Sequence, residues 1–161
     1  MPGQLKTPLP LKDYCKNNRF FHYHREELMS GKQSSYGGLQ KNVRKLKTPP
    51  IEVWTNQYQD KDYLINLDLP EFTCICPKTG LPDFAVLRIS YRPHKWCLEL
   101  KSLKMYINWF RDIGIFHEHL VNRVRDDLVS TCQPNWMQVV AEFNVRGGIK
   151  TTVTAQYESK V

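Results

Sequence analysis

The feature that most constrains the fold of this 161-residue chain is a change in the spacing of its apolar residues. Apolar and polar positions alternate in two runs between residues 63 and 91. Between residues 103 and 128 the apolar positions recur every three or four residues, and from 137 to 157 they alternate again. Because alternation predicts half-buried strands and the longer spacing predicts amphipathic helices, the order is two strands, two helices and two strands.

Each predicted element has a set of residues that should face the core. The strand positions are Tyr63, Ile65, Leu67 and Leu69; Ala85, Leu87, Ile89 and Tyr91; Met137, Val139, Ala141, Phe143 and Val145; and Ile149, Thr151, Val153, Ala155 and Tyr157. The first helix should follow Ser102 as its N-cap and stop before Gly114. The second should bury Leu120, Val121, Val124 and Leu128 and end before Pro134. The stretch 96–100 predicts a short strand or the start of the first helix.

Two hairpins that flank two helices predict an α+β fold, in which an antiparallel four-stranded sheet carries both helices on one face. The order of elements is ββααββ. Such a sheet has open edges, which are a liability in a monomer and are removed when subunits pair them. We therefore expect an oligomer.

The net positive charge of the chain comes from its first 50 residues. Residues 1–50 hold 10 Lys and Arg against 3 Asp and Glu, a net +7, whereas residues 51–161 hold 13 of each, a net of zero. We expect residues 1–50 to form a basic, partly ordered extension and residues 51–161 to form the domain. Such an extension either binds a polyanion or is simply solvated, and its turn-rich composition favours the second, so direct binding of nucleic acid is not expected.

Composition also indicates the compartment. The chain has no run of about 20 apolar residues and no apolar region near its start, which predicts a cytoplasmic protein without a membrane segment. Its five cysteines are odd in number and irregular in spacing, as in a reducing compartment.

Two of these cysteines, Cys74 and Cys76, form a C-x-C motif. No further ligands follow at a familiar spacing, so no metal is expected. Cys74 lies inside an apolar run and predicts a core residue. Cys76 ends the strand before a Pro-Lys-Thr-Gly turn, whose free amides and lysine favour a thiolate, so it is either a structural residue or a reactive thiol.

Acidic residues near these motifs allow both structural and chemical interpretations. Asp83 follows Pro82 and is either a turn residue or a general acid. His117-Glu118-His119 does not have the spacing of a metalloprotease motif. Glu118 either complements the dipole of the second helix or accepts two neighbouring N–H groups, such as those on a guanine edge.

Two basic motifs are candidates for phosphate binding. Lys101 and Lys104 share a face at the start of the first helix, where they either face water or bind phosphate. Arg146-Gly147-Gly148 predicts a hairpin turn, and it is also a place where backbone can approach a phosphate closely.

Four stretches resemble, in order and spacing, the single-module NADPH-dependent 7-cyano-7-deazaguanine reductases (QueF). They are YLINLDLPEFTCICPKTGLPDF, ELKSLKMY, FRDIGIFHEHLVNRV and FNVRGGIKTTV, and the resemblance covers about residues 50–158. It implies reduction of the nitrile of 7-cyano-7-deazaguanine to a primary amine by two NADPH, on the route to the tRNA nucleoside queuosine.

The resemblance also implies roles for individual residues. Cys76 matches the nucleophile that forms a covalent thioimide, and Asp83 matches the proton donor. The remaining matches are substrate-binding residues (Leu98, Glu99, Leu100, His117 and Glu118) and NADPH-binding residues (Leu100, Lys101, Lys104, Arg146 and Gly147). Some relatives have Ser at the position of Leu100, and some have a protective second cysteine where this chain has Leu120.

The implied fold is the tunnelling fold, whose subunits close into rings with active sites at subunit boundaries, commonly as decamers of two stacked pentamers. Three alternatives stay open. One is a relative that hydrolyses the nitrile, and another is an amidinotransferase that adds nitrogen to the same nitrile in tRNA. The third is a ring that binds a nucleobase or RNA without catalysis.

Overall fold

The computed structural model describes residues 38–40 and 42–160, which lie almost entirely in a compact unit that begins at Leu39. Most of the predicted basic extension, residues 1–50, is therefore outside the described residues. The domain boundary that we expected at residue 51 stays a prediction. Among the described residues, no helix has both the length and the apolar character needed to cross a membrane.

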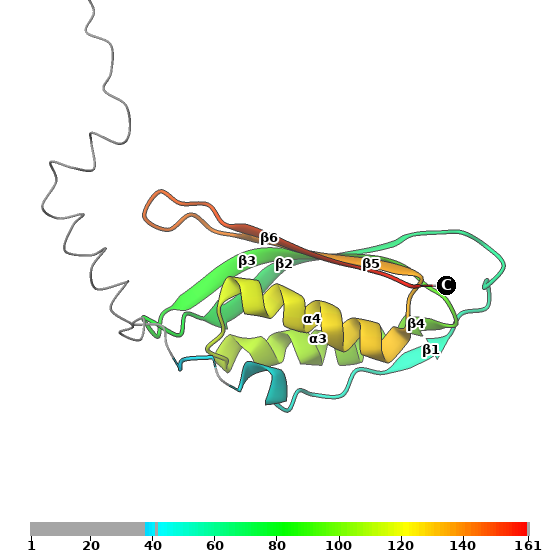
Figure 1. The fold of residues 1–161 in the computed structure, drawn as a ribbon, viewed down its shortest axis with the longest axis horizontal. Coiled ribbons are helices and arrows are strands. Elements are labelled where there is room, and N and C mark those ends of the chain that lie inside the picture. Colours follow the sequence, from blue (N-terminus) through cyan, green and yellow to red (C-terminus); the bar gives the residue numbers. More distant parts are fainter. Residues whose placement is uncertain (1–37, 41, 161) are drawn as a thin grey trace, which may run out of the picture. The chain divides into compact units, whose positions relative to one another are not determined.

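The described chain forms a main sheet, a small second sheet and two α-helices (Figure 1). The main sheet is antiparallel with the order β2-β3-β5-β6, and β1 pairs with β4 in the small sheet. The strands are β1 (Val53–Thr55), β2 (Ile65–Ile75), β3 (Pro82–Arg92), β4 (Trp96–Leu98), β5 (Trp136–Phe143) and β6 (Thr152–Glu158). The helical elements are η1 (Val43–Lys45), α3 (Leu100–Trp109), η2 (Phe110–Asp112) and α4 (His117–Cys132). The predicted ββααββ order is confirmed for the main sheet, whereas β1 was not predicted.

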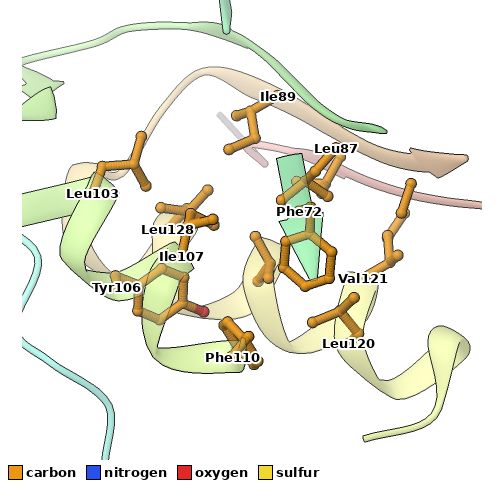
Figure 2. Packing of buried hydrophobic residues seen from close by; sticks show 14 of the residues in the cluster. Phe72, Leu87, Ile89, Leu103, Tyr106, Ile107, Phe110, Leu120, Val121 and Leu128 are labelled. Atoms are coloured by element: carbon orange, nitrogen blue, oxygen red, sulfur yellow. The ribbon is translucent and has the colours of Figure 1, made fainter. Parts of the chain in front are cut away.

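Both helices cover the same face of the sheet, and the core lies between them and the strands (Figure 1). Figure 2 shows Phe72, Leu87 and Ile89 from the sheet facing Phe110 and Leu128 from the helical layer. The predicted inward residues of β3 and α4 are all buried. Each buried side chain of this size contributes about 1.5–3 kcal/mol through removal of apolar surface from water, so this layer accounts for much of the stability.

Four predicted boundaries were wrong. The first helix begins at Leu100 because Glu99, and not Ser102, caps it; Ser102 lies inside the helix. The same helix ends at Trp109 and continues as the 3₁₀ turn η2. The last two strands were predicted to include Val145 and Ile149, but both are exposed because the hairpin between β5 and β6 opens into a wider turn around Gly147 and Gly148.

Arg123 of α4 attaches the segment before β1 to the helical layer. Its side chain is largely buried, and it donates to the Val43 carbonyl at 2.6 Å and the Leu46 carbonyl at 2.8 Å. Its Nε also binds Asp127, which accepts a hydrogen bond from Tyr106 on α3. Residues 43–46 are therefore part of the packed unit.

This attachment predicts different effects for two truncations. Removal of residues 1–46 takes both carbonyls from the largely buried guanidinium and should lower the free energy of unfolding by about 1–3 kcal/mol. Removal of residues 1–38 keeps these contacts and is the matched control. Urea denaturation of the two proteins measures the difference, and equal stability would show that Arg123 does not need this segment.

Candidate active site

The strand β2 ends in a tight turn that holds Cys76. The Cys76 N–H donates to the Leu81 carbonyl, and the Gly80 N–H donates to the Cys76 carbonyl, each at 2.9 Å. Gly80 has φ +70°, a left-handed conformation that other residues adopt at a cost. The hydrogen-bonded turn therefore places a half-buried thiol directly beyond the strand end.

The surroundings of Cys76 favour its thiolate. Burial raises the pKa of this thiol, but hydrogen bonds from the Thr79 hydroxyl and the backbone N–H groups of Thr79 and Lys78 outweigh burial. The pKa is lower than the usual value even though the charge of Asp83 opposes ionisation. By contrast, burial raises the pKa of Cys74 to about 12, with a smaller contribution from Asp83. Of these two thiols, Cys76 is the one prepared for nucleophilic chemistry.

Asp83, on β3, pairs with Cys74 of the neighbouring strand β2 and is only 3% exposed. It is part of a strand, so the interpretation of Asp83 as a turn residue was wrong. Its two carboxylate oxygens have separate partners: Oδ1 lies 2.6 Å from Arg146 Nη1 and Oδ2 lies 3.3 Å from His117 Nε2. A buried carboxylate is stable only with such partners, which here come from two other parts of the fold, the hairpin between β5 and β6 and the start of α4.

His117 and Glu118 form the first turn of α4. The His117 ring stacks on Phe143, with the two ring centroids 3.4 Å apart and the planes at 8°. Glu118 is exposed, and within the described residues no hydrogen bond or ion pair is made by its carboxylate. A stacked aromatic pair beside an uncommitted carboxylate is suited to a flat, polar ligand.

Arg146 and Gly147 lie in the hairpin between β5 and β6. Arg146 and Ile149 form an isolated antiparallel bridge, and Gly147 and Gly148 have φ of 54° and 80°. The predicted turn is confirmed. Arg146 also donates to the carbonyl of Pro82, so the hairpin tip is joined to the start of β3 next to Asp83.

The other predicted site residues surround the start of α3. Leu98 is buried, and its N–H donates to the Tyr91 hydroxyl at 3.1 Å. The Glu99 carboxylate accepts the N–H groups of Ser102 at 2.7 Å and Lys101 at 2.8 Å, which lowers its pKa. The side chains of Leu100, Lys101 and Lys104 are exposed. Because the Glu99 carboxylate already accepts the first free N–H groups of α3, a phosphate at this end would be bound by the ammonium groups of Lys101 and Lys104 and not by the backbone of the helix N-terminus.

Within one chain these two groups of residues are far apart. Tyr91, which binds Leu98, is eight residues along β3 from Asp83, or roughly 26 Å at the usual rise of a strand. Figure 1 accordingly shows β4 and the start of α3 at one end of the sheet and the start of α4 at the other. The structure therefore brings together Cys76, Asp83, His117 and Arg146, but it separates them from the segment 98–104. Among the described residues, no three His, Cys, Asp or Glu side chains are grouped so that they could hold a metal ion.

Comparison with known proteins decides the family. Residues 82–161 match the family described as QueF-like protein. The NADPH-dependent 7-cyano-7-deazaguanine reductase of Nitrosococcus oceani is 54% identical over 107 residues, which are 66% of this chain and 83% of that protein. The enzyme of the same name from Chlorobaculum tepidum is 56% identical over 107 residues, 66% of this chain and 92% of that protein. The chain belongs to the family of 7-cyano-7-deazaguanine reductases.

The fold of this chain is similar to that of a protein whose structure has been solved. The archaeosine synthase QueF-Like in its apo form is 20% identical and aligns with a TM-score of 0.56. The alignment covers 60% of this chain and 94% of that one. At this identity the likeness shows a shared fold only.

Sequence reasoning missed three residues that support the candidate site. Thr79 helps to lower the pKa of Cys76, and Phe143 stacks on His117. The Gln40 side chain accepts from Phe116 N–H at 3.3 Å and donates to the Gly114 carbonyl at 3.2 Å, which secures the segment just before His117. The Thr79 side chain lies in the Pro-Lys-Thr-Gly turn and could have been found there. Gln40 and Phe143 act across long separations in sequence, and no local signal marks them.

Proposed function

We propose that this protein is an NADPH-dependent oxidoreductase that reduces the nitrile of 7-cyano-7-deazaguanine to 7-aminomethyl-7-deazaguanine, in queuosine modification of tRNA. One observation carries the proposal. A thiol with a lowered pKa, Cys76, lies beside the buried carboxyl group of Asp83 in a member of this reductase family. A nitrile accepts hydride poorly until a nucleophile has added to its carbon, and a thiolate is such a nucleophile.

The first chemical step uses only residues of this chain. The Cys76 sulfur forms a bond to the nitrile carbon and one π pair moves to the nitrogen. The protonated form of Asp83 gives this nitrogen its proton, which leaves a thioimide and the Asp83 carboxylate. NADPH, when bound, supplies two hydrides in succession. After the first reduction the carbon–sulfur bond breaks and Cys76 leaves as a thiolate. Water would hydrolyse the resulting imine, so the site must exclude water until the second reduction.

Recognition of the base is assigned to the start of α4. The Glu118 carboxylate can accept two parallel hydrogen bonds from the guanine-like edge of the substrate. His117 is held by Phe143 and Asp83, so it presents a fixed edge to the ligand. This assignment places the base next to the Cys76 turn, because a β-bridge between Ile75 and Gly114 joins the two segments.

The cationic residues fit the phosphates of NADPH. Lys101 and Lys104 present exposed ammonium groups on α3, and Gly147 leaves the hairpin tip without a side chain beside Arg146. Arg146 cannot hold both Asp83 and a phosphate with the same N–H groups. A phosphate would therefore have to bind the N–H groups of Arg146 that Asp83 and the Pro82 carbonyl do not use, or displace Asp83.

The separation of the two residue groups within one chain supports a site built from two copies. Leu98, Glu99 and Leu100 of one subunit would complete the pocket formed around Cys76 of the next. The edges of the described main sheet, β2 and β6, are free for pairing between subunits. We therefore assign a tunnelling-fold ring, a decamer of two stacked pentamers. Light scattering checks this, and a stable monomer with full activity would exclude it.

The decisive experiment mixes the purified protein with 7-cyano-7-deazaguanine and NADPH and follows the absorbance of the reduced nicotinamide. We expect two NADPH to be oxidised for each nitrile reduced. Loss of the nitrile without NADPH oxidation would instead identify a hydrolase, or an amidinotransferase if a nitrogen donor is needed. Binding of the base without any loss of the nitrile would identify a non-catalytic ring.

Lys101→Ala and Lys104→Ala should each raise the KM for NADPH much more than the KM for the nitrile. Loss of one charge-assisted hydrogen bond to phosphate costs about 1.5–3 kcal/mol, or roughly 10- to 150-fold in affinity. Lys61→Ala, which removes an exposed ammonium paired with Asp60, is the control and should leave both constants unchanged. Equal effects on both substrates would point to a structural role for the two lysines.

A further inference from the structure

The Gln40 side chain joins the start of the described chain to the segment that leads into α4. Its Nε2 donates to the carbonyls of Leu39 at 2.9 Å and Gly114 at 3.2 Å. Its Oε1 accepts the Phe116 N–H at 3.3 Å and lies 3.2 Å from Nδ1 of His119. A side-chain amide has two hydrogens and two acceptor positions, so this amide makes every hydrogen bond that it can.

Only an amide matches this set of partners. The Gly114 carbonyl needs a donor and the Phe116 N–H needs an acceptor, so these two contacts fix which end of the amide is the oxygen. Because Oε1 can only accept, Nδ1 of His119 donates to it. A carboxylate at position 40 would turn an oxygen toward the Gly114 carbonyl, and an apolar side chain would satisfy none of these groups.

The contacts of Gln40 lie on both sides of the two residues assigned to the base. Phe116 is the N-cap of α4, and its side chain has no atom that can accept a hydrogen bond. Gln40 serves this helix start from 76 residues away in the sequence. His117 and Glu118 come next, and His119 is bound by the same oxygen as Phe116. One amide therefore holds the chain directly before and directly after this pair.

The segment before α4 is also bound to the end of β2. The Ile75 N–H donates to the Ile113 carbonyl and the Ile115 N–H donates to the Ile75 carbonyl, each at 3.0 Å. The side chain of Ile115 is fully buried. Backbone groups along residues 113–116 are thus bonded alternately to β2 and to Gln40. The start of α4 is held from two sides, and Gln40 supplies the second.

We propose that Gln40 is a positioning residue for recognition of the substrate base. It holds His117 and Glu118 where they meet the base, and it does not itself touch the reacting atoms. The proposal rests on the function proposed above, in which these two residues bind 7-cyano-7-deazaguanine. Gln40 is half-buried and lies outside the hydrophobic core, so its replacement should affect the site more than the stability of the fold.

The test replaces Gln40 with methionine in the full-length protein, which keeps the length of the side chain and removes the amide. Hydrogen exchange, measured by mass spectrometry, should be faster in the peptide that contains Phe116. The KM for 7-cyano-7-deazaguanine should rise roughly 5- to 30-fold, as expected for the net loss of one to two hydrogen bonds, and the KM for NADPH by less than about twofold. Gln59→Met is the control. It removes another amide that donates to a backbone carbonyl, that of Asn56 at 3.1 Å, and should change neither constant.

An unchanged KM for the nitrile in Gln40→Met would overturn the inference, and so would an equal rise in both KM values, which indicates a general structural role. Gln40→Ala is the second test if the methionine variant does not fold, and it should show the same pattern. If the wild-type protein neither binds nor reduces the nitrile, the proposed function fails, and the role of Gln40 in base recognition fails with it. Its role in holding the start of α4 is decided by hydrogen exchange alone.

Discussion

Cys76→Ala should form no adduct with 7-cyano-7-deazaguanine and should have no measurable reductase activity. The wild-type protein, given the nitrile without NADPH, should gain the mass of one substrate per active site, and NADPH should then remove the adduct. Among the described cysteines, Cys74, Cys97 and Cys132 are buried, so only Cys76 combines accessibility with a lowered pKa. Loss of a nucleophile typically costs about a thousandfold or more in turnover.

Cys74→Ala is the matched control for this experiment. Cys74 is two residues earlier on the same strand, and its side chain packs in the core with a strongly raised pKa. Its replacement should lower stability through the loss of a buried sulfur, but it should keep the adduct and the turnover. Intact-mass spectrometry and NADPH oxidation report the two quantities. If Cys76→Ala formed as much adduct as the wild-type protein, the assignment of Cys76 as the nucleophile would be wrong.

Asp83→Asn should slow both formation of the thioimide and reduction of the nitrile. The amide keeps the shape of the carboxyl group but cannot deliver the proton that the nitrile nitrogen needs. Loss of a general acid costs about 10²- to 10⁴-fold in rate. Rapid mixing followed by mass analysis measures adduct formation, and the slowed step should be this one and not the binding of the base.

The Asp83 variant needs a test for structural damage, because Asp83 is also the partner of Arg146 and His117. Removal of its charge leaves a guanidinium next to a neutral amide, so we expect some loss of stability as well. Urea denaturation separates this loss from the effect on chemistry. Asp68→Asn, which changes an exposed carboxylate on β2, should affect neither rate nor stability appreciably. Normal turnover by Asp83→Asn would remove this residue from the mechanism.

Much of the fold could be predicted because its evidence is local. Alternation in Ala85, Leu87, Ile89 and Tyr91 reports which face of one strand is buried, whatever that strand pairs with. The three-to-four spacing from Leu120 to Leu128 does the same for α4. The short strand β1 was missed because its three residues are too few to show a period.

The start of α3 shows the limit of local signals. Both Glu99 and Ser102 are residues that can occupy a helix terminus, and the pattern of apolar positions favoured the later one. The structure begins the helix at Leu100 because the Glu99 carboxylate reaches two free amides. Ser102 instead accepts the backbone N–H of Glu52, a contact with a segment fifty residues earlier that no window of sequence contains.

The sequence by itself determined the order of the main-sheet strands and the two helices, the buried faces of β3 and α4, and the motifs that place the chain in its family, because each of these depends on neighbouring residues. Only the tertiary structure decided that Asp83 is buried between Arg146 and His117, and that Gln40 supports the turn before His117. It alone also separates Leu98 from Cys76 by the length of the sheet. These relations depend on which distant segments pack together, and that choice is made by the free energy of the whole core and not by any local pattern.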